Sequence, residues 1–302
     1  MSLPRQIVPG RVYLVTRRCT QRQFLLRPDP ETTNAFIYCL GYAAQRSGIK
    51  VIAFLASSNH YHAVVIDEEG RIPTFLEDFH RPVARHQNRL RKRRENLWST
   101  EQTSLVELIG DATILAKVIY TLANPVKDHL VEKATHWPGA SSFQATVFGK
   151  VLVARRPLRF FRRDGEMPAT VQLRCHRIPG LKDVAADAYA RTLIEGIRQV
   201  ELTASAERKR TGRTLLGRKA VLAQPPENRP GSVEVKRPIR AKVSSALPHL
   251  LAEAIDRLKS FRNAYAASRE AWLRSEKTTF PLGTWWLSRF AAVDCEPYLQ
   301  AA

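Results

Sequence analysis

Two apolar runs separated by only three residues constrain the fold of this chain more than any other feature. Residues 50–56 and 60–66 are apolar and contain several β-branched and aromatic side chains, and Ser57-Ser58-Asn59 between them has the composition of a turn. We therefore predict two strands joined by a short turn. Both runs are apolar on both faces, so we expect both strands to lie centrally in a sheet.

Further strand and helix signals surround this pair. Caps, breakers and apolar spacing predict a strand over 11–16 and helices over 29–46, 73–97 and 111–125. The order β-α-β-β-α, followed by a further helix, predicts an α+β domain in which helices cover a small antiparallel sheet. This is the arrangement of ferredoxin-like and RRM-like domains. We expect it to close near Phe148, within a domain spanning residues 1–150.

The remainder of the chain, residues 151–302, differs in composition. It holds 28 basic and 15 acidic residues, against 20 and 13 in residues 1–150. The whole chain has a formal net charge of +20, which favours a polyanionic partner because each neutralised phosphate releases counterions. We predict a partly helical extension with a Pro-rich stretch over 224–239. It is either an arm that binds DNA or an accessory linker without a defined site.

Several classes of protein are disfavoured. No apolar run approaches the roughly 20 residues that span a bilayer, and the N-terminus lacks the apolar core of a signal peptide. The four cysteines are far apart and form no CxxC pair, which argues against a zinc knuckle and a disulfide framework. We expect a soluble intracellular protein that does not bind membranes.

Two histidines lie one residue apart in the second apolar run. Side chains alternate along a strand, so His60 and His62 face the same way, about 7 Å apart. Two imidazoles in this arrangement can converge on one metal ion. They can equally be core side chains with hydrogen-bond partners only, and the pair alone does not decide between these interpretations.

A tyrosine and an asparagine form a second pair. Tyr120 and Asn124 are four residues apart on the predicted helix 111–125, so they lie roughly 5–6 Å apart on one face. Pro125 follows directly, which places Asn124 where the helix ends and its side chain can point outward. The alternative is that Tyr120 only packs against the core and that Asn124, before Pro125, only ends the helix.

A dense basic run follows the predicted strands. Residues 81–94 include seven basic side chains, and Arg81, Arg85 and Arg89 recur every four positions along one helix face. Such a stripe can be a solvated surface, but almost no acidic residue compensates it, which favours phosphate binding. The candidate DNA-binding residues are Arg81, Arg85, Arg89, Arg91, Lys92 and Arg93.

Taken together, these motifs resemble a known family. Asn59-His60-Tyr61-His62 followed by Tyr120-xxx-Asn124-Pro125-Val126 is similar to the HUH single-tyrosine transposases, and closest to the REP-associated tyrosine transposases, relatives of the transposases of the smallest insertion sequences. The flanking segments 12–17, 96–98, 136–138 and 141–143 resemble further family motifs in the same order. The resemblance covers about residues 8–145. Ser57-Ser58 stand where the family usually has Met-Pro.

The resemblance implies a specific chemistry. His60, His62 and Asn124 would hold a divalent metal, Mg²⁺ or Mn²⁺, and Tyr120 would be the catalytic nucleophile. Such an enzyme nicks single-stranded or hairpin DNA, with short palindromic repeats as candidate targets, through a 5′-phosphotyrosine and rejoins strands without ATP. The resemblance also implies a bacterial, nucleoid-associated protein in the cytoplasm, either monomeric or homodimeric.

Other functions stay open at this point. The chain could be a domesticated DNA-binding protein that keeps the fold without strand transfer. It could also be a general nucleic-acid-binding module in which His60 and His62 are structural, or a relaxase or replication initiator that shares the chemistry. Covalent capture of DNA by Tyr120 distinguishes the enzymes from the binding proteins.

Overall fold

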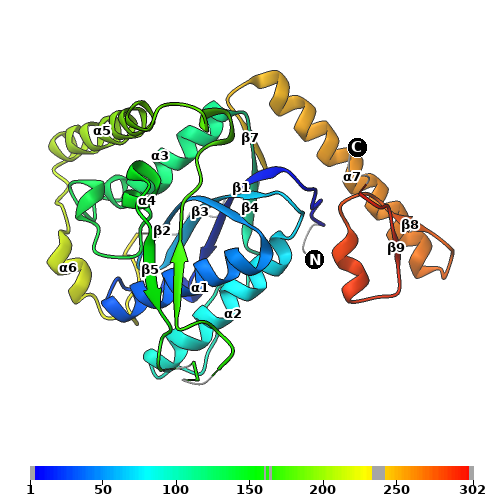
Figure 1. Ribbon diagram of the computed structural model, residues 1–302, viewed down its shortest axis with the longest axis horizontal. Coiled ribbons are helices and arrows are strands. Elements are labelled where there is room, and N and C mark those ends of the chain that lie inside the picture. Colours follow the sequence, from blue (N-terminus) through cyan, green and yellow to red (C-terminus); the bar gives the residue numbers. More distant parts are fainter. Residues whose placement is uncertain (1–3, 160, 163–164, 233–241, 299–302) are drawn as a thin grey trace.

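Five strands form one sheet at the centre of the molecule (Figure 1). The computed structural model describes residues 4–159, 161–162, 165–232 and 242–298. The sheet consists of β2 (Lys50–Ala56), β3 (His60–Asp67), β1 (Arg11–Arg18), β4 (Ser104–Ile109) and β7 (Val243–Ser245), in that order. The first four strands pair antiparallel, whereas β7 runs parallel to β4. The predicted α+β class is confirmed, and β1–β4 have the strand order of a ferredoxin-like sheet.

One face of the sheet is covered by α1 (Pro30–Ser47) and α2 (Ile72–Leu90). The side chain of Asp29 caps α1 by accepting a hydrogen bond from the backbone N–H of Thr32 at 2.8 Å. The helix ends at Gly48, whose φ of 69° suits a residue without Cβ. Aromatic side chains from both helices meet Tyr61 of β3 in the core on this face.

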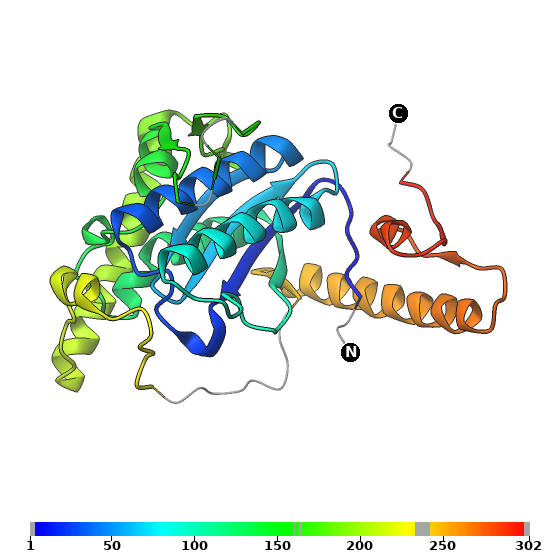
Figure 2. The same ribbon diagram turned by 90° about the horizontal axis from the view of Figure 1, so that it is seen from below.

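The opposite face is covered by α3 (Asp111–Lys127), on which α5 (Ala186–Thr211) packs. Because side chains alternate along β3, His62 and Val64 point to this face while Tyr61 points to the other. The two helices approach closely at Gly196 of α5, where an added Cβ would lie 2.2 Å from Cδ1 of Ile119. Figure 2 shows the helices on both sides of the sheet.

The outer edge of β2 is covered by a non-helical segment. The backbone N–H of Ala56 donates to the carbonyl of Ala140, and Ser142 exchanges hydrogen bonds with Phe54 through its backbone and its hydroxyl. Trp137 donates its indole N–H to the carbonyl of Ala56 at 3.1 Å. The expectation that both apolar strands are central therefore holds for β3 only. β2 is the last strand of the sheet, and segment 137–142 covers its edge.

The second half of the chain adds several elements to this core. They are α4 (Phe143–Phe148), the hairpin β5 (Leu152–Arg155) and β6 (Thr170–Leu173), α6 (Arg218–Ala223), α7 (Pro248–Leu273), β8 (Thr279–Phe280) and β9 (Asp294–Cys295). The β5–β6 hairpin packs on α1, and α7 projects from the body of the molecule (Figure 2). The boundary at residue 150 stays a prediction, although β7 from this half pairs with β4.

The predicted Pro-rich stretch 224–239 is described as far as residue 232. This part, which we call the 224–232 segment, lies along the chain that follows β1. The backbone N–H of Phe24 donates to the carbonyl of Asn228 at 2.9 Å. Arg22 donates to the carbonyl and the hydroxyl of Ser232 at 2.6 and 2.8 Å. Residues 233–239 lie outside the described residues.

Several element boundaries differ from the sequence prediction. The helix expected over 73–97 ends at Leu90, since Lys92 has a positive φ of 54° and the chain then turns to pair with Cys19. β4 and α5 were not predicted. α3 continues through Pro125 to Lys127, because a proline in the last turn removes only one helical hydrogen bond. Among the described residues, no helix combines the length and apolarity that crossing a membrane requires.

Candidate active site

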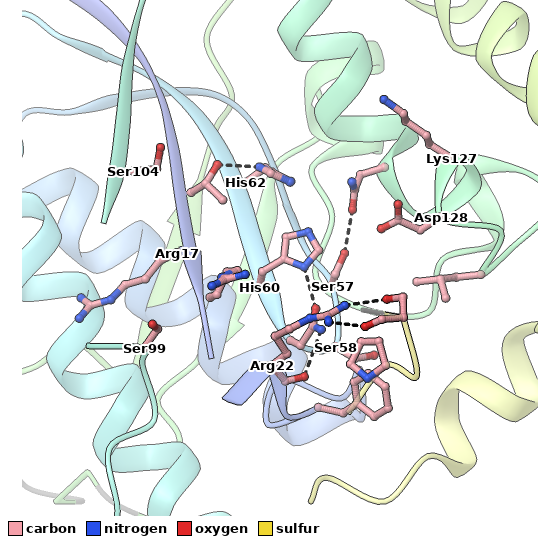
Figure 3. Close-up of a pocket in the computed structure, with 18 of the residues that line it drawn as sticks. Arg17, Arg22, Ser57, Ser58, His60, His62, Ser99, Ser104, Lys127 and Asp128 are labelled. Atoms are coloured by element: carbon pink, nitrogen blue, oxygen red, sulfur yellow. Dashed lines mark hydrogen bonds between the residues drawn. The ribbon is translucent and has the colours of Figure 1, made fainter. Parts of the chain in front are cut away.

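A cleft of about 1020 Å³ opens at one end of the sheet, where β1 and β3 meet the end of α3 (Figure 3). Its lining includes the four residues predicted to carry chemistry, namely His60, His62, Tyr120 and Asn124. The two pairs that the sequence places about 60 residues apart thus share one site. Their convergence follows from α3 crossing the face of the sheet on which His62 lies.

Strand register places the two imidazoles side by side. His62 lies directly opposite Thr16 and His60 opposite Arg18 in the β1–β3 pairing. The ring centroids of His60 and His62 are 4.9 Å apart in an edge-to-face arrangement. His62 is buried, whereas His60 is partly exposed at the cleft.

Hydrogen bonds fix the orientation of both rings. Nδ1 of His60 lies 2.7 Å from Oδ1 of Asn59, and Nδ2 of Asn59 donates to the carbonyl of Arg22 at 3.1 Å. Because Oδ1 can only accept, His60 carries its proton on Nδ1 and has a lone pair on Nε2. Nδ1 of His62 is 2.8 Å from the hydroxyl of Thr16. Partners of this kind orient imidazoles that bind metals.

The environment keeps both imidazoles neutral. The pKa of His60 is lowered to about 4, mainly by burial and also by the charge of Arg18, while a hydrogen bond with Asn124 opposes the shift. Burial lowers the pKa of His62 well below its ordinary value, and the charges of His60 and Lys117 act in the same direction. Neutral imidazole is the form that coordinates a metal.

α3 supplies the other pair. The ring of Tyr120 contacts His62 edge-to-face, with 5.2 Å between ring centroids. Asn124 lies one turn further along α3 and is only 3% exposed. Its Oδ1 accepts a hydrogen bond from the hydroxyl of Ser57 at 2.9 Å. The expectation that Asn124 points outward at the helix end is therefore wrong, because α3 continues and directs this amide into the cleft.

Two lysines of the same helix approach the ring of Tyr120. Nζ of Lys127 lies 5.1 Å from the ring centroid and Nζ of Lys117 lies 5.9 Å from it. Both distances are within the range of cation–π attraction. Their ammonium groups place positive charge beside the phenol.

The donor set fits a divalent cation. The two neutral imidazoles favour transition-metal ions, whereas the amide oxygen is a donor that Mg²⁺ and Mn²⁺ accept. No three His, Cys, Asp or Glu side chains of the described chain are placed to hold a metal ion. His60, His62 and Asn124 are the cleft residues that supply this donor set.

The predicted basic stripe lies elsewhere. Arg81, Arg85 and Arg89 are exposed on α2, which covers the face of the sheet opposite His62, and none of them lines the cleft. Arg91 is largely buried and pairs with Asp29 at the start of α1. Lys92 and Arg93, which follow α2, do not line the cleft either. A role in DNA binding stays a prediction for all six residues.

Other basic side chains, which do not belong to the predicted stripe, line the cleft instead. They are Arg17 and Arg18 of β1, Arg22 after it, Lys127 at the end of α3, and Arg213 after α5. The place of Lys127 could be predicted from the sequence, because Lys127 follows Tyr120 by seven residues and residues seven apart lie on one face of a helix. The places of Arg18 and Thr16 could not be predicted in this way, because their position opposite the histidines depends on the register between β1 and β3.

Solved structures with a similar fold include the following two. A structure of a REP-associated tyrosine transposase bound to a REP hairpin has a TM-score of 0.41 at 16% identity, covering 56% of this chain and 96% of that chain. A crystal structure described as a "putative transposase" from Deinococcus radiodurans R1 has a TM-score of 0.28 at 18% identity, covering 35% of this chain and 85% of that chain.

No family model matches the chain, and no curated protein matches it. With identities below 20% and TM-scores below 0.5, the two solved structures carry no information about activity. The function therefore has to be inferred from the residues of the cleft.

Proposed function

We propose that this protein is a metal-dependent DNA endonuclease and strand transferase that acts on single-stranded or hairpin DNA through Tyr120. The observation that carries the proposal is the convergence of Tyr120 with His60, His62 and Asn124 in one cleft. A nucleophile one helical turn from a metal ligand is held by one rigid element, which favours reaction at a bound phosphate.

In this proposal, His60, His62 and Asn124 hold Mg²⁺ or Mn²⁺. When bound, the cation supplies Lewis-acid stabilisation of charge on a phosphate oxygen. The chain itself supplies the ligand orientation, through Asn59 on His60, Thr16 on His62 and Ser57 on Asn124. These partners keep the donors in place, so little reorganisation is needed when substrate binds.

Tyr120 performs the covalent step. Its phenol oxygen forms a bond to phosphorus and loses its proton, while the bond between phosphorus and the 3′-oxygen breaks and that oxygen takes up a proton. The products are a 5′-phosphotyrosine and a free 3′-hydroxyl. Since the phosphodiester energy is retained in the tyrosyl linkage, attack by another 3′-hydroxyl rejoins DNA without ATP.

Charge supports DNA as the substrate. Arg18, Arg22, Lys127 and Arg213 bring positive charge to the cleft from three separate segments of the chain. The chain as a whole carries +20, so long-range attraction favours a polyanion. Unpaired DNA gives such a cleft access to its phosphates, which duplex geometry restricts.

Covalent capture tests the proposal directly. End-labelled single-stranded hairpin DNAs are incubated with the protein and Mn²⁺ or Mg²⁺, and a denaturant-resistant adduct is sought on a denaturing gel. We expect a metal-dependent adduct that Tyr120→Phe abolishes while the dissociation constant for DNA changes less than about threefold. The matched control is Tyr42→Phe on α1, which removes a hydroxyl on the opposite face of the sheet and should leave the adduct unchanged.

The alternative is a DNA-binding protein that retains the fold without strand transfer. It predicts tight DNA binding with no adduct across a broad pool of hairpins and single strands, and affinity that chelator does not alter. An adduct that persists in Tyr120→Phe would instead show that another residue is the nucleophile, and the proposed role of Tyr120 would be wrong.

A further inference from the structure

Arg17 lies in the cleft but faces away from the histidines. It pairs with Tyr61 across β1 and β3, so its side chain projects to the α2 side of the sheet, whereas Thr16 and His62 lie on the α3 side. Figure 3 shows the Arg17 guanidinium on the other side of β1 from His60 and His62. The cleft therefore passes around the end of β1.

The guanidinium of Arg17 is held rigidly. Its Nη1 donates to Nδ1 of His80 at 2.6 Å, and its Cζ lies 5.4 Å from the ring centroid of Trp98. His80 is fixed in turn, since its Nε2 lies 2.6 Å from the hydroxyl of Tyr61. A stacked arginine with donors to spare is a preorganised receptor for a planar or tetrahedral oxyanion.

The positive charge of Arg17 has no acidic partner. Within the described residues, neither Arg17 nor Arg5 forms an ion pair with a carboxylate, and the cleft residue Glu101 pairs with Arg18 at 3.1 Å. Burial lowers the pKa of Arg17. Burial and the neighbouring charge of Arg17 lower the pKa of Arg5 to about 10. Two half-buried cations without a counter-charge favour a bound anion.

The guanidinium has a donor available at the cleft. Within the described residues, Nη2 of Arg17 makes no hydrogen bond and is not fully buried, whereas Nε is enclosed. Ser99, Gln102 and Thr103 line the cleft together with Arg17 and are uncharged hydrogen-bonding residues. Arg5 lies behind this wall, because it donates to the carbonyl of Thr103.

We propose that Arg17, with Ser99, Gln102 and Thr103, forms a second phosphate subsite that binds a phosphodiester of the DNA other than the one attacked by Tyr120. We call these four residues the Arg17 subsite. The inference rests on the proposed function. A strand that contacts both Tyr120 and the Arg17 subsite has to turn around the end of β1. A single strand can make such a turn within a few nucleotides, whereas duplex DNA is too stiff.

Backbone neutralisation tests the subsite without any cleavage. The protein carrying Tyr120→Phe is titrated with single-stranded DNAs that each contain one uncharged methylphosphonate linkage, and binding is followed by fluorescence anisotropy. We expect one linkage away from the cleavage position to weaken binding about tenfold, as the loss of one charge-assisted contact implies. In Arg17→Gln the same linkage should have no effect on binding, because Arg17, the partner of that phosphate, is already absent.

The matched control is Arg198→Gln, which removes an exposed guanidinium on α5 outside the cleft and should keep the tenfold effect. If the methylphosphonate profile is the same in Arg17→Gln and in the parent protein, the subsite is wrong. If Arg17→Gln does not fold, Arg17→Lys takes its place. It should shrink the linkage effect to less than about threefold, and an unchanged profile in this variant overturns the inference.

Inorganic phosphate gives a readout that is independent of strand transfer. At equal ionic strength, phosphate should raise the melting temperature of the wild-type protein more than chloride does, and Arg17→Gln, or Arg17→Lys in its place, should remove most of that difference. An equal phosphate effect in both proteins would contradict the subsite. If no adduct ever forms but the phosphonate and phosphate effects depend on Arg17, the proposed enzyme fails while the anion site stands.

Discussion

Ser57 is the residue through which this chain departs most visibly from the motif it otherwise resembles. Its hydroxyl donates to Oδ1 of the buried Asn124, so one lone pair of that oxygen is directed to Ser57 and the amide plane is fixed. The neighbouring Ser58 is also buried, but its hydroxyl has no partner among the described residues. The two adjacent serines therefore form a natural pair of test positions.

We expect Ser57→Ala to weaken Mn²⁺ binding about tenfold, the lower end of what loss of an orienting partner usually costs. The dissociation constant is measured by titration of Mn²⁺ into the protein without DNA, followed by electron paramagnetic resonance of the free ion. Ser58→Ala should change it less than twofold, and Ser57→Thr should restore it. Equal affinities in Ser57→Ala and Ser58→Ala would mean that Asn124 needs no positioning, or is not a ligand.

At this scale, part of the site was accessible from sequence. The spacing of His60 and His62 and the spacing of Tyr120 and Asn124 follow from strand and helix geometry, and all four residues line one cleft. The residues that orient these four side chains could not be predicted, since Thr16 reaches His62 only because of the register of β1 against β3. The predicted outward direction of Asn124 failed because a proline near a helix end does not fix which turn is the last.

Among the helices, the position of α3 beside the cleft agrees with the site predicted from the sequence, whereas the position of α2 does not. Helical periodicity predicted the basic stripe of Arg81, Arg85 and Arg89 correctly as one exposed face. It could not reveal that α2 lies beside α1, away from the cleft, because the face of the sheet that a connecting helix covers depends on the handedness of the whole β-α-β-β-α unit. α5 escaped prediction, although it supports the helix that carries Tyr120 and Asn124.

The contact between α3 and α5 makes a prediction about Gly196. A glycine inside a helix is normally destabilising, yet here a Cβ would meet Ile119. We expect Gly196→Val to lower the free energy of unfolding by about 1–3 kcal/mol through overpacking. Ala206→Val on the exposed side of the same helix should cost at most about 0.5 kcal/mol, because only helix propensity changes.

Urea denaturation followed by circular dichroism measures both variants. If Gly196→Val and Ala206→Val have the same free energy of unfolding, the close packing of α5 against α3 is not energetically important. A selective loss in Gly196→Val should also slow adduct formation, because a small shift of α3 displaces Tyr120 relative to the phosphate.

For the molecule as a whole, buried neutral histidines should make stability depend on pH. Burial lowers the pKa of His60 and of His86 to about 4, and lowers the pKa of His62 and His80 well below the ordinary value. The unfolded chain takes up protons on these residues near pH 6.5, whereas the folded chain does not. Stability is therefore retained above pH 6.5 and is lost as the pH falls toward 4.

We expect the free energy of unfolding to fall by several kcal/mol between pH 7.5 and pH 5, since each such histidine contributes up to about 2 kcal/mol. Urea denaturation in the presence of chelator measures it, because a bound cation would compete with protons. His86→Gln should reduce the slope. A flat profile would mean that these imidazoles take up protons in the folded protein as readily as in the unfolded chain.

The pairing of β7 with β4 has a consequence for how the protein is made. About 130 residues separate the two strands, so a ribosome that adds 5–20 residues per second completes β4 roughly ten seconds before β7 emerges. During that interval the nascent chain carries an unpaired strand edge beside an otherwise assembled sheet. Slow translation through the second half would prolong this exposure, so yield in expression should respond to codon usage between β4 and β7 more than to codon usage after β7.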